Sequence, residues 1–296
     1  MKLRFCLALL VCCYVLRPAL AGEAPEGMVL IPAGSFEMGL EEEELDDILE
    51  FSSIPRLKKR CRSWFGNETP RREVQVEAFY MDAHEVTNRE FIEFVRATGY
   101  QSEGEWARYT GAGRMDHPIV NITWNDASEY ARWAGKRLPT EIEWEYAAKG
   151  GRDVSWFPWG DTADDGSKSN YNHEGETFFS ELPVVLRIKE KPRISTEPVG
   201  SYEPNGFGLY DVIGNAAELV QDTFAHYPGG PEEGELLCRR SPAKEDKKKM
   251  VPCKVVRGGA WNSSDPGWAR LTLRQRASPL WYGWDIGFRC AKSIRE

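Results

Sequence analysis

Residues 117–151 read HPIVNITWNDASEYARWAGKRLPTEIEWEYAAKGG, and they hold the strongest folding signals in the chain. Asn125 is placed to cap a first helix, and Gly135 is placed to end it. A second helix opens with the capping box at residues 140–143 and ends at Gly150. Both helices are short and amphipathic, so each must pack against another element. The apolar face of the first helix recurs at helical spacing: Ala127, Tyr130, Ala131 and Ala134.

Similar signals occur upstream of this stretch. Residues 87–90 form another capping box, apolar residues follow at helical spacing, and Gly99 is placed to end the helix. Residues 28–39 (MVLIPAGSFEMG) predict a strand, a turn and a second strand. Residues from about 41 to 66 pass from an acidic run into a basic one. We interpret them as an exposed insertion with room for a short helix.

The pattern becomes irregular downstream of Gly151. Short apolar runs alternate with Gly, Pro, Asn and Asp, and residues 228–254 resemble a second insertion because they are polar and lack a periodic apolar face. Helices followed by short strands and loops predict an α+β fold with little regular structure. The 296 residues, 41% of them apolar, can bury a sizeable core in a single domain. We expect three tryptophans to be buried anchors: Trp124, Trp133 and Trp144.

The N-terminus has the pattern of a secretory signal peptide over residues 1–21. It has a positive start at Lys2 and Arg4, an apolar run over residues 5–16 and small residues at 19 and 21. That run is too short to span a bilayer easily, and no later segment is apolar enough to cross one. A lipid-anchored form acylated on a cysteine of this segment is the alternative. The predicted location is therefore secreted, periplasmic or the lumen of the secretory pathway.

Charge narrows the classes of partner. The net charge is −8, and it becomes −11 once the signal segment, with three basic residues and no acid, is removed. A chain this acidic is not expected to bind nucleic acid or anionic membranes. The acidic balance is compatible with cation binding.

Four cysteines remain outside the signal segment: Cys61, Cys238, Cys253 and Cys290. An even number in an exported chain permits two disulfides. Cys238 and Cys253 bracket a polar loop, and we expect them to pair, which would stabilise the fold by about 3 kcal/mol. Cys61 then pairs with Cys290, or both stay free. No C-x-x-C pair or suitably spaced His is present for a zinc site.

Seven blocks of the chain, taken together and in order, resemble the formylglycine-generating enzyme (sulfatase-modifying factor) family, which includes non-catalytic paralogues and bacterial relatives. The resemblance covers about residues 28–292, apart from the two insertions. It implies a single-domain, C-type-lectin-like α+β fold, usually in an exported protein. The blocks are residues 28–39, 77–95, 117–151, 157–161, 197–222, 255–261 and 286–291.

The resemblance also implies where the family's chemistry would take place. The family's enzymes use two cysteines five residues apart, after an Arg-Gly-Gly-Ser-type strand, to hold copper and oxidise a substrate cysteine. A thiolate pair suits Cu(I). In this chain Ser263 and Trp268 stand at those two positions, and Ala260 replaces a serine of the same pocket. A hydroxyl and an indole cannot form a copper dithiolate, so copper-dependent formylglycine generation is not expected.

The leading functional hypothesis is therefore a binding module. It would use the cleft of a catalytic fold to hold a peptide, a sulfatase-like protein or a small-molecule ligand. Aromatic rings in such a cleft can stack on a peptide or a sugar, although core packing explains each of them equally well. A purely structural or regulatory subunit is a third hypothesis. The candidate lining is Ala260, Asn262, Ser263, Asp265, Trp268, Trp281, Tyr282 and Trp284.

A calcium site is also implied by the resemblance. Residues 213–218 match the family's calcium loop, in which main-chain carbonyls and a glutamate bind the cation. Glu218 would be the charged ligand, with further oxygens from Ile213, Gly214, Asn215 or Ala216. A weaker second site would begin at Asn170 and Tyr171, but its aspartate partner is missing near Lys191.

An oxidoreductase with different chemistry is the alternative function. Some relatives are mononuclear iron oxidases, and such a site needs paired His ligands. His84, Glu85 and His117 do not supply that spacing, although His173 and His226 cannot be placed from the sequence. Iron is thus kept as an alternative cofactor.

Overall fold

The computed structural model describes residues 24–51, 62, 64–154, 156–162, 164–171, 195–230, 234–239, 249–263 and 266–294. The predicted signal peptide, Cys61 and Asp265 lie outside these residues. In the described part, four helices and eleven short strands form one α+β body, as predicted. No described helix is both long and apolar enough to cross a bilayer.

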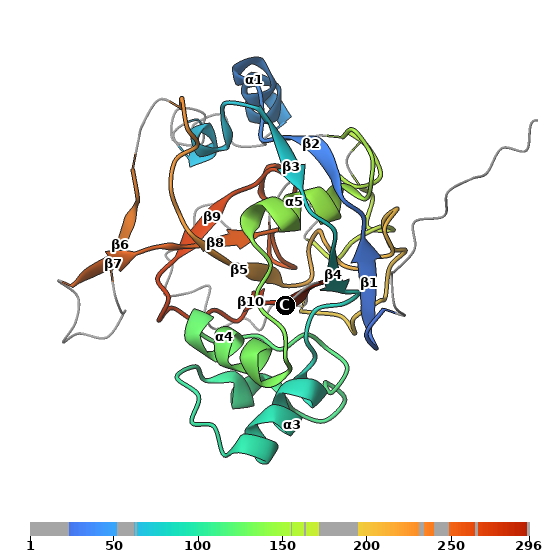
Figure 1. Ribbon diagram of the computed structural model, residues 1–296, viewed down its shortest axis with the longest axis vertical. Coiled ribbons are helices and arrows are strands. Elements are labelled where there is room, and N and C mark those ends of the chain that lie inside the picture. Colours follow the sequence, from blue (N-terminus) through green and yellow to red (C-terminus); the bar gives the residue numbers. More distant parts are fainter. Residues whose placement is uncertain are drawn as a thin grey trace, which may run out of the picture.

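A four-stranded sheet in the order β10-β5-β8-β9 lies at the centre of the molecule (Figure 1). β10 runs parallel to β5, and the other neighbours in this sheet are antiparallel. β1, β4 and β11 form a second, antiparallel sheet, and the pairs β2–β3 and β6–β7 form two antiparallel ribbons of two strands each. The strands are β1 (Met28–Ile31), β2 (Gly34–Met38), β3 (Arg72–Val76), β4 (Phe79–Asp82), β5 (Ala217–Thr223), β6 (Leu237–Arg239), β7 (Met250–Pro252), β8 (Lys254–Arg257), β9 (Gln275–Ala277), β10 (Ile286–Gly287) and β11 (Ala291–Ser293).

Three of the four described helices begin at capping boxes. α3 starts after Thr87 and α5 after Thr140, as predicted. α4 also starts at a capping box, but its cap is Thr123, and the prediction of Asn125 was wrong. Asn125 already lies inside the first turn of α4. The helices are α1 (Glu42–Phe51), α3 (Asn88–Thr98), α4 (Trp124–Trp133) and α5 (Glu141–Lys149), with 3₁₀ turns η2 (Gly66–Glu68), η3 (Trp106–Tyr109) and η5 (Pro266–Trp268).

Both faces of the central sheet are covered by apolar residues. Successive side chains of a strand point to opposite faces. In β8, Val255 therefore joins the core that contains Trp144, while Val256 joins the core that contains Phe91 of α3. Figure 1 shows α3 and α4 together at one end of the molecule and α1 at the other.

The first insertion is less exposed than the sequence suggests. Leu45, Ile48 and Leu49 on α1 are buried and pack with Phe65 and Leu273 in a third apolar cluster. The acidic run supplies only the outer face of this helix. Its helix α1 and Phe65 are therefore part of the folded body.

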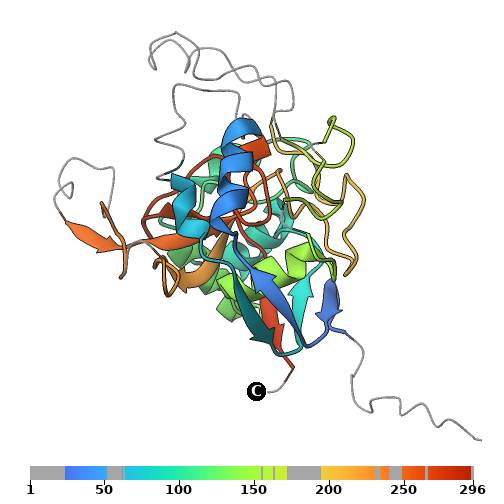
Figure 2. The same ribbon diagram turned by 90° about the horizontal axis from the view of Figure 1, so that it is seen from above.

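Two further expectations have mixed outcomes. Trp144 is fully buried and Trp124 is half-buried, but Trp133 at the end of α4 is 42% exposed and packs against Phe94 and Tyr130. The predicted disulfide between Cys238 and Cys253 is present, while Cys290 is a buried free thiol. The disulfide joins the β6–β7 hairpin, which projects from the body in both views, to the residue before β8 (Figures 1 and 2).

Candidate functional site

The turn after β8 brings together the two positions that resemble copper-binding cysteines. Gly259 has a positive φ of 71°, and a Cβ there would lie 3.1 Å from Ser263 Oγ and only 2.3 Å from the Trp268 carbonyl oxygen. Such a close approach requires glycine. The Ser263 side chain and the Trp268 main chain therefore both lie against Gly259, although neither residue carries a thiol.

Ser263 is engaged in the turn itself. Its Oγ accepts a hydrogen bond from the Ala260 N–H at 3.0 Å, and its own N–H donates to the Ala260 carbonyl at 2.9 Å. Both residues are buried. Ala260 and Ser263 therefore stabilise the turn and do not line an open cleft, which corrects that part of the predicted lining.

Trp268 is packed against aromatic residues that precede η2. Its ring centroid lies 5.3 Å from that of Trp64 and 5.0 Å from that of Phe65, in edge-to-face arrangements. Such contacts are favourable beyond the area that they bury. The second former cysteine position is thus filled by an indole beneath the first insertion, and Trp268 belongs more to the core than to a cleft.

Three aromatic residues of the predicted lining, Trp281, Tyr282 and Trp284, lie on the loop that precedes β10. Trp281 and Trp284 are 44% and 45% exposed, and Tyr282 is half-buried. Asn262 Nδ2 donates to Asp285 Oδ2 at 2.8 Å and so ties this loop to the turn after β8. Of the predicted lining, the aromatic side chains exposed to a ligand are therefore those on this loop.

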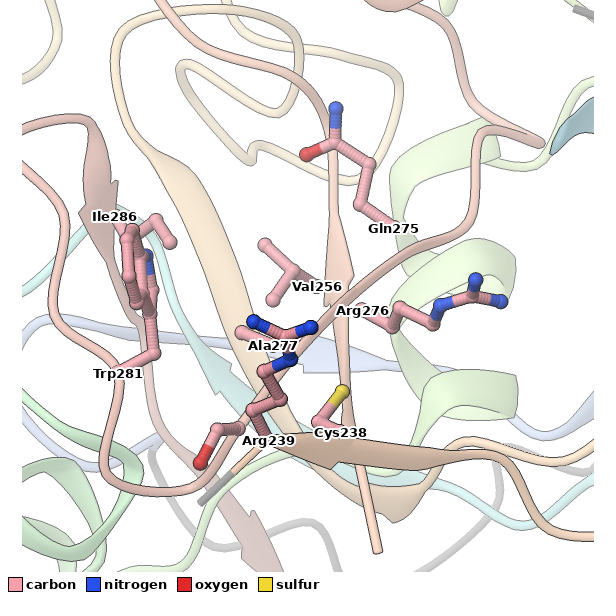
Figure 3. Close-up of a pocket in the computed structure, with 9 residues that line it drawn as sticks. Cys238, Arg239, Val256, Gln275, Arg276, Ala277, Trp281 and Ile286 are labelled. Atoms are coloured by element: carbon pink, nitrogen blue, oxygen red, sulfur yellow. The ribbon is translucent and has the colours of Figure 1, made fainter. Parts of the chain in front are cut away.

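A cavity of about 260 Å³ lies beside Trp281. Its floor is apolar, made of Val256, Ala277 and Ile286, and its sides include Arg239 and Trp281 (Figure 3). The floor residues come from β8, β9 and β10, and Arg239 comes from the projecting hairpin. The cavity is thus a product of the fold and of the second insertion together. The chain sequence shows each residue type but not this convergence.

The stretches that resemble calcium loops lie side by side. Asn170 and Gly214 form an isolated parallel bridge, and the Asn215 N–H donates to the Asn170 carbonyl at 2.8 Å. Ile213 and Tyr171 are buried next to them. The predicted primary and secondary loops therefore form one local structure.

Glu218, the predicted charged calcium ligand, is occupied by protein groups. Its carboxylate accepts hydrogen bonds from Arg289, at 2.7 Å from Nη2 to Oε1, and from Trp144 Nε1 at 2.7 Å. All three side chains are buried. A calcium site built on Glu218 does not fit these residues, because both carboxylate oxygens already have donors.

The same loop is bound by a second carboxylate, which the sequence offered only as a neighbour of His84 in a candidate iron site. Glu85 accepts hydrogen bonds from Asn215 Nδ2 at 2.8 Å and from the Ala216 N–H at 2.9 Å. Burial, followed by the nearby Asp211 and Glu218, raises the pKa of Glu85 well above its usual value. Burial likewise raises the pKa of Asp211 to about 6. One arginine, Arg289, thus serves several buried acids.

The candidate iron ligands do not converge. His84 stacks on Tyr210, with ring centroids 4.5 Å apart, and His117 Nδ1 lies 3.2 Å from Thr196 Oγ1. Across the described ranges, no three His, Cys, Asp or Glu side chains are grouped so that they could hold a metal ion. His173 lies outside these ranges.

Comparisons with known proteins agree with this architecture. A family model described as "Sulfatase-modifying factor enzyme 1-like domain" matches residues 17–294. The formylglycine-generating enzyme of Bos taurus is 32% identical over 311 residues, which cover 90% of this chain and 75% of that protein. The inactive C-alpha-formylglycine-generating enzyme 2 of Mus musculus is 28% identical over 312 residues, which cover 90% and 85%.

A solved structure shares the same fold. The structure of PvdO from Pseudomonas aeruginosa superimposes with a TM-score of 0.61 at 27% identity, over 90% of this chain and 94% of that one. The family model extends over nearly the whole chain, and relatives near 30% identity do the same. The chain therefore belongs to the sulfatase-modifying factor family.

Proposed function

We propose that this chain is an exported, non-catalytic member of its family that binds a ligand at the surface beside the former active site. The observation that carries the proposal is the state of the two former cysteine positions. Ser263 is held by the Ala260 main chain, and Trp268 is packed against Trp64 and Phe65. Neither side chain can supply a thiolate for Cu(I).

Two further observations support binding without turnover. Trp281 and Trp284 expose large aromatic surface, and Trp281 lines a cavity, which is a common arrangement for ligand recognition. A relative that aligns with 90% of the chain bears the name of an inactive formylglycine-generating enzyme. The ligand is a peptide, a protein such as a sulfatase, or a small molecule.

The loss of catalysis is tested with a peptide that contains the sequence Cys-x-Pro-x-Arg. Purified protein is incubated with this peptide, oxygen and copper, and the peptide is analysed by mass spectrometry. The bovine formylglycine-generating enzyme serves as the positive control. We expect no conversion of the cysteine by the present chain. Copper-dependent conversion would refute the assignment of Ser263 and Trp268 as non-catalytic.

Export is the second part of the proposal, and it rests on the pattern of residues 1–21. Expression of the full chain in a host with a secretory pathway should yield mature protein that begins at Gly22. N-terminal sequencing measures this directly. Protein that keeps Met1 and stays in the cytosol would contradict export.

Calcium binding is retained as a proposal from the resemblance alone. Because Arg289 and Trp144 donate to the Glu218 carboxylate, the proposal relies on the main-chain oxygens of residues 213–216 as ligands. Stabilisation by calcium, measured as a shift in Tm, is the test.

A further inference from the structure

The cavity beside Trp281 has a lining that combines one flat apolar surface with positive charge. Val256, Ala277 and Ile286 form the floor, and the indole of Trp281 stands at one side next to Ile286 (Figure 3). Trp281 remains 44% exposed, so its ring is available to a molecule in the cavity. A cavity of this composition favours a planar, apolar body.

The charge of the lining is opposite to that of the whole chain. The chain carries a net charge of −8, yet the cavity is lined by Arg239 and Arg276 and by no acidic residue. Within the described part of the chain, neither arginine forms an ion pair with an acid. Guanidinium groups without an acidic partner, at a cavity with an apolar floor, favour an anionic ligand.

The two arginines are not equivalent. In Figure 3 the Arg239 side chain extends over the middle of the cavity, towards Val256 and Ala277, while Arg276 points away from it. The Arg276 guanidinium lies instead 5.7 Å from the centre of the Phe224 ring, which belongs to the apolar core that contains Trp144. Arg239 is therefore the group placed to meet a negative charge.

The position of Arg239 is fixed by the second insertion. Arg239 pairs with Met250 across the β6–β7 ribbon and follows Cys238 directly. The disulfide connects Cys238 to Cys253, which is fully buried and adjoins β8. The covalent link holds this hairpin beside the sheet and so keeps Arg239 over the cavity floor.

We propose that this cavity binds a small organic anion, one in which a planar apolar body carries a single carboxylate or similar acidic group. The apolar body would lie on Val256 and Ala277 against Trp281, and the acidic group would pair with Arg239. The inference rests on the proposed binding function and specifies its ligand class. A volume of about 260 Å³ accommodates a one- or two-ring molecule but not a folded partner.

The test uses three probes that share one ring system and differ in charge: indole-3-acetate, indole-3-acetamide and tryptamine. Binding to the purified mature chain is measured by ligand-observed NMR titration. Since a hydrogen bond to a charged group contributes more than one to a neutral group, we expect the anion to bind about tenfold more tightly than the amide. Equal affinity for the anion and the amide, or tighter binding of tryptamine, would overturn the proposal.

Three variants test whether Arg239 and Trp281 produce the preference for the anion over the amide. Arg239→Gln should abolish the preference for the anion, whereas Arg96→Gln, which removes the same charge from the exposed face of α3, should retain it. Trp281→Leu should weaken the anion and the amide by the same factor. A preference that survives Arg239→Gln would refute the role of that arginine. Each variant changes an exposed residue, so an unchanged Tm verifies that the fold is intact.

One further arm identifies the source of the acidic group. A tripeptide that ends in tryptophan is compared with its C-terminal amide. Tighter binding of the free acid peptide than of indole-3-acetate would assign the anion to a chain terminus, and the reverse order would assign it to a free small molecule. The formylglycine assay is independent of these titrations, so conversion of the Cys-x-Pro-x-Arg peptide would sink the proposed function without altering the measured anion preference.

Discussion

Asp211 illustrates how a single residue in this family fold can be placed under strain by its surroundings. Its backbone has a positive φ of 54°, and Oδ2 accepts the Gly200 N–H at 2.6 Å. The carboxyl group is almost completely buried near Glu85 and Glu218. Burial raises its pKa to about 6, since a buried carboxylate loses hydration.

This raised pKa predicts a pH dependence of stability. In the folded chain Asp211 holds its proton up to about pH 6, while in the unfolded chain it releases it near its ordinary value. The stabilisation by the protonated form is complete below the unfolded pKa and is lost as pH rises through 6. Asp211→Asn keeps the shape and tolerates positive φ. The variant should therefore gain stability over the wild type between pH 4.5 and 7, by on the order of 2 kcal/mol.

Urea unfolding at both pH values measures this difference. Glu203→Gln is the matched control, because it removes one exposed carboxylate from the same region. Its stability relative to wild type should be the same at both pH values. If Asp211→Asn behaves like that control, Asp211 has an ordinary pKa.

The roles of single residues were only partly predictable. The loss of a thiol at Ser263 and Trp268 is visible in the sequence, because it is a matter of residue type. The engagement of Glu218 is not visible, since its partner Arg289 lies 71 positions away and nothing local indicates the pair. The role of Arg239 was not predicted for the same reason. It depends on a disulfide that places Arg239 over the cavity floor, which other parts of the chain form.

The starts of the helices could be predicted from the local sequence more fully than the roles of single residues. Three helices begin at a Thr followed three residues later by Glu or Asp, and in all three the reciprocal hydrogen bonds are present. The error at α4 came from preferring Asn125 to the Thr-x-x-Asp pattern at 123–126. Thr123 Oγ1 accepts the Asp126 N–H at 3.1 Å, and Asp126 Oδ2 accepts the Thr123 N–H at 2.9 Å.

The corrected cap gives a direct prediction. Thr123→Ala removes the hydrogen bond to the Asp126 N–H, so we expect the free energy of unfolding to fall by about 1–2 kcal/mol. Asn125→Ala should change it by less than about 0.5 kcal/mol, because Asn125 reaches only the exposed Glu103. Chemical denaturation of both variants measures the contrast. The reverse order would restore Asn125 as the cap.

The burial of α1 could not be predicted from the sequence of the insertion alone. Its acidic residues predict an exposed surface, and its outer face has that character. Leu45, Ile48 and Leu49 are buried because they pack with Phe65 of the same insertion and with Leu273. Leu273 lies more than 200 positions further along the chain, so the insertion by itself does not reveal what covers these apolar positions.

Across the whole molecule, buried ion pairs connect segments that are distant in sequence. Arg270 pairs with Glu68, Arg274 with Glu141, and Arg289 with Glu218, and every one of these side chains is buried. Irregular chain of this kind has few long strands or helices to fix its tertiary arrangement. These arginines instead join loops, helix and sheet through several hydrogen bonds each, including bonds to main-chain carbonyls.

A variant of the Arg289–Glu218 pair can show whether Glu218 serves as an internal ion-pair partner or as a calcium ligand. Glu218→Gln leaves the Arg289 guanidinium buried without its bidentate partner, and removal of one member of such a pair costs about 3–5 kcal/mol. Because Glu218 is bound by Arg289 and Trp144, this loss should be equal in calcium and in a chelator. Thermal and urea unfolding under both conditions measure it. If Glu218 were a calcium ligand, the variant would lose stability mainly in calcium, and the chelator would bring the wild type down to the level of the variant.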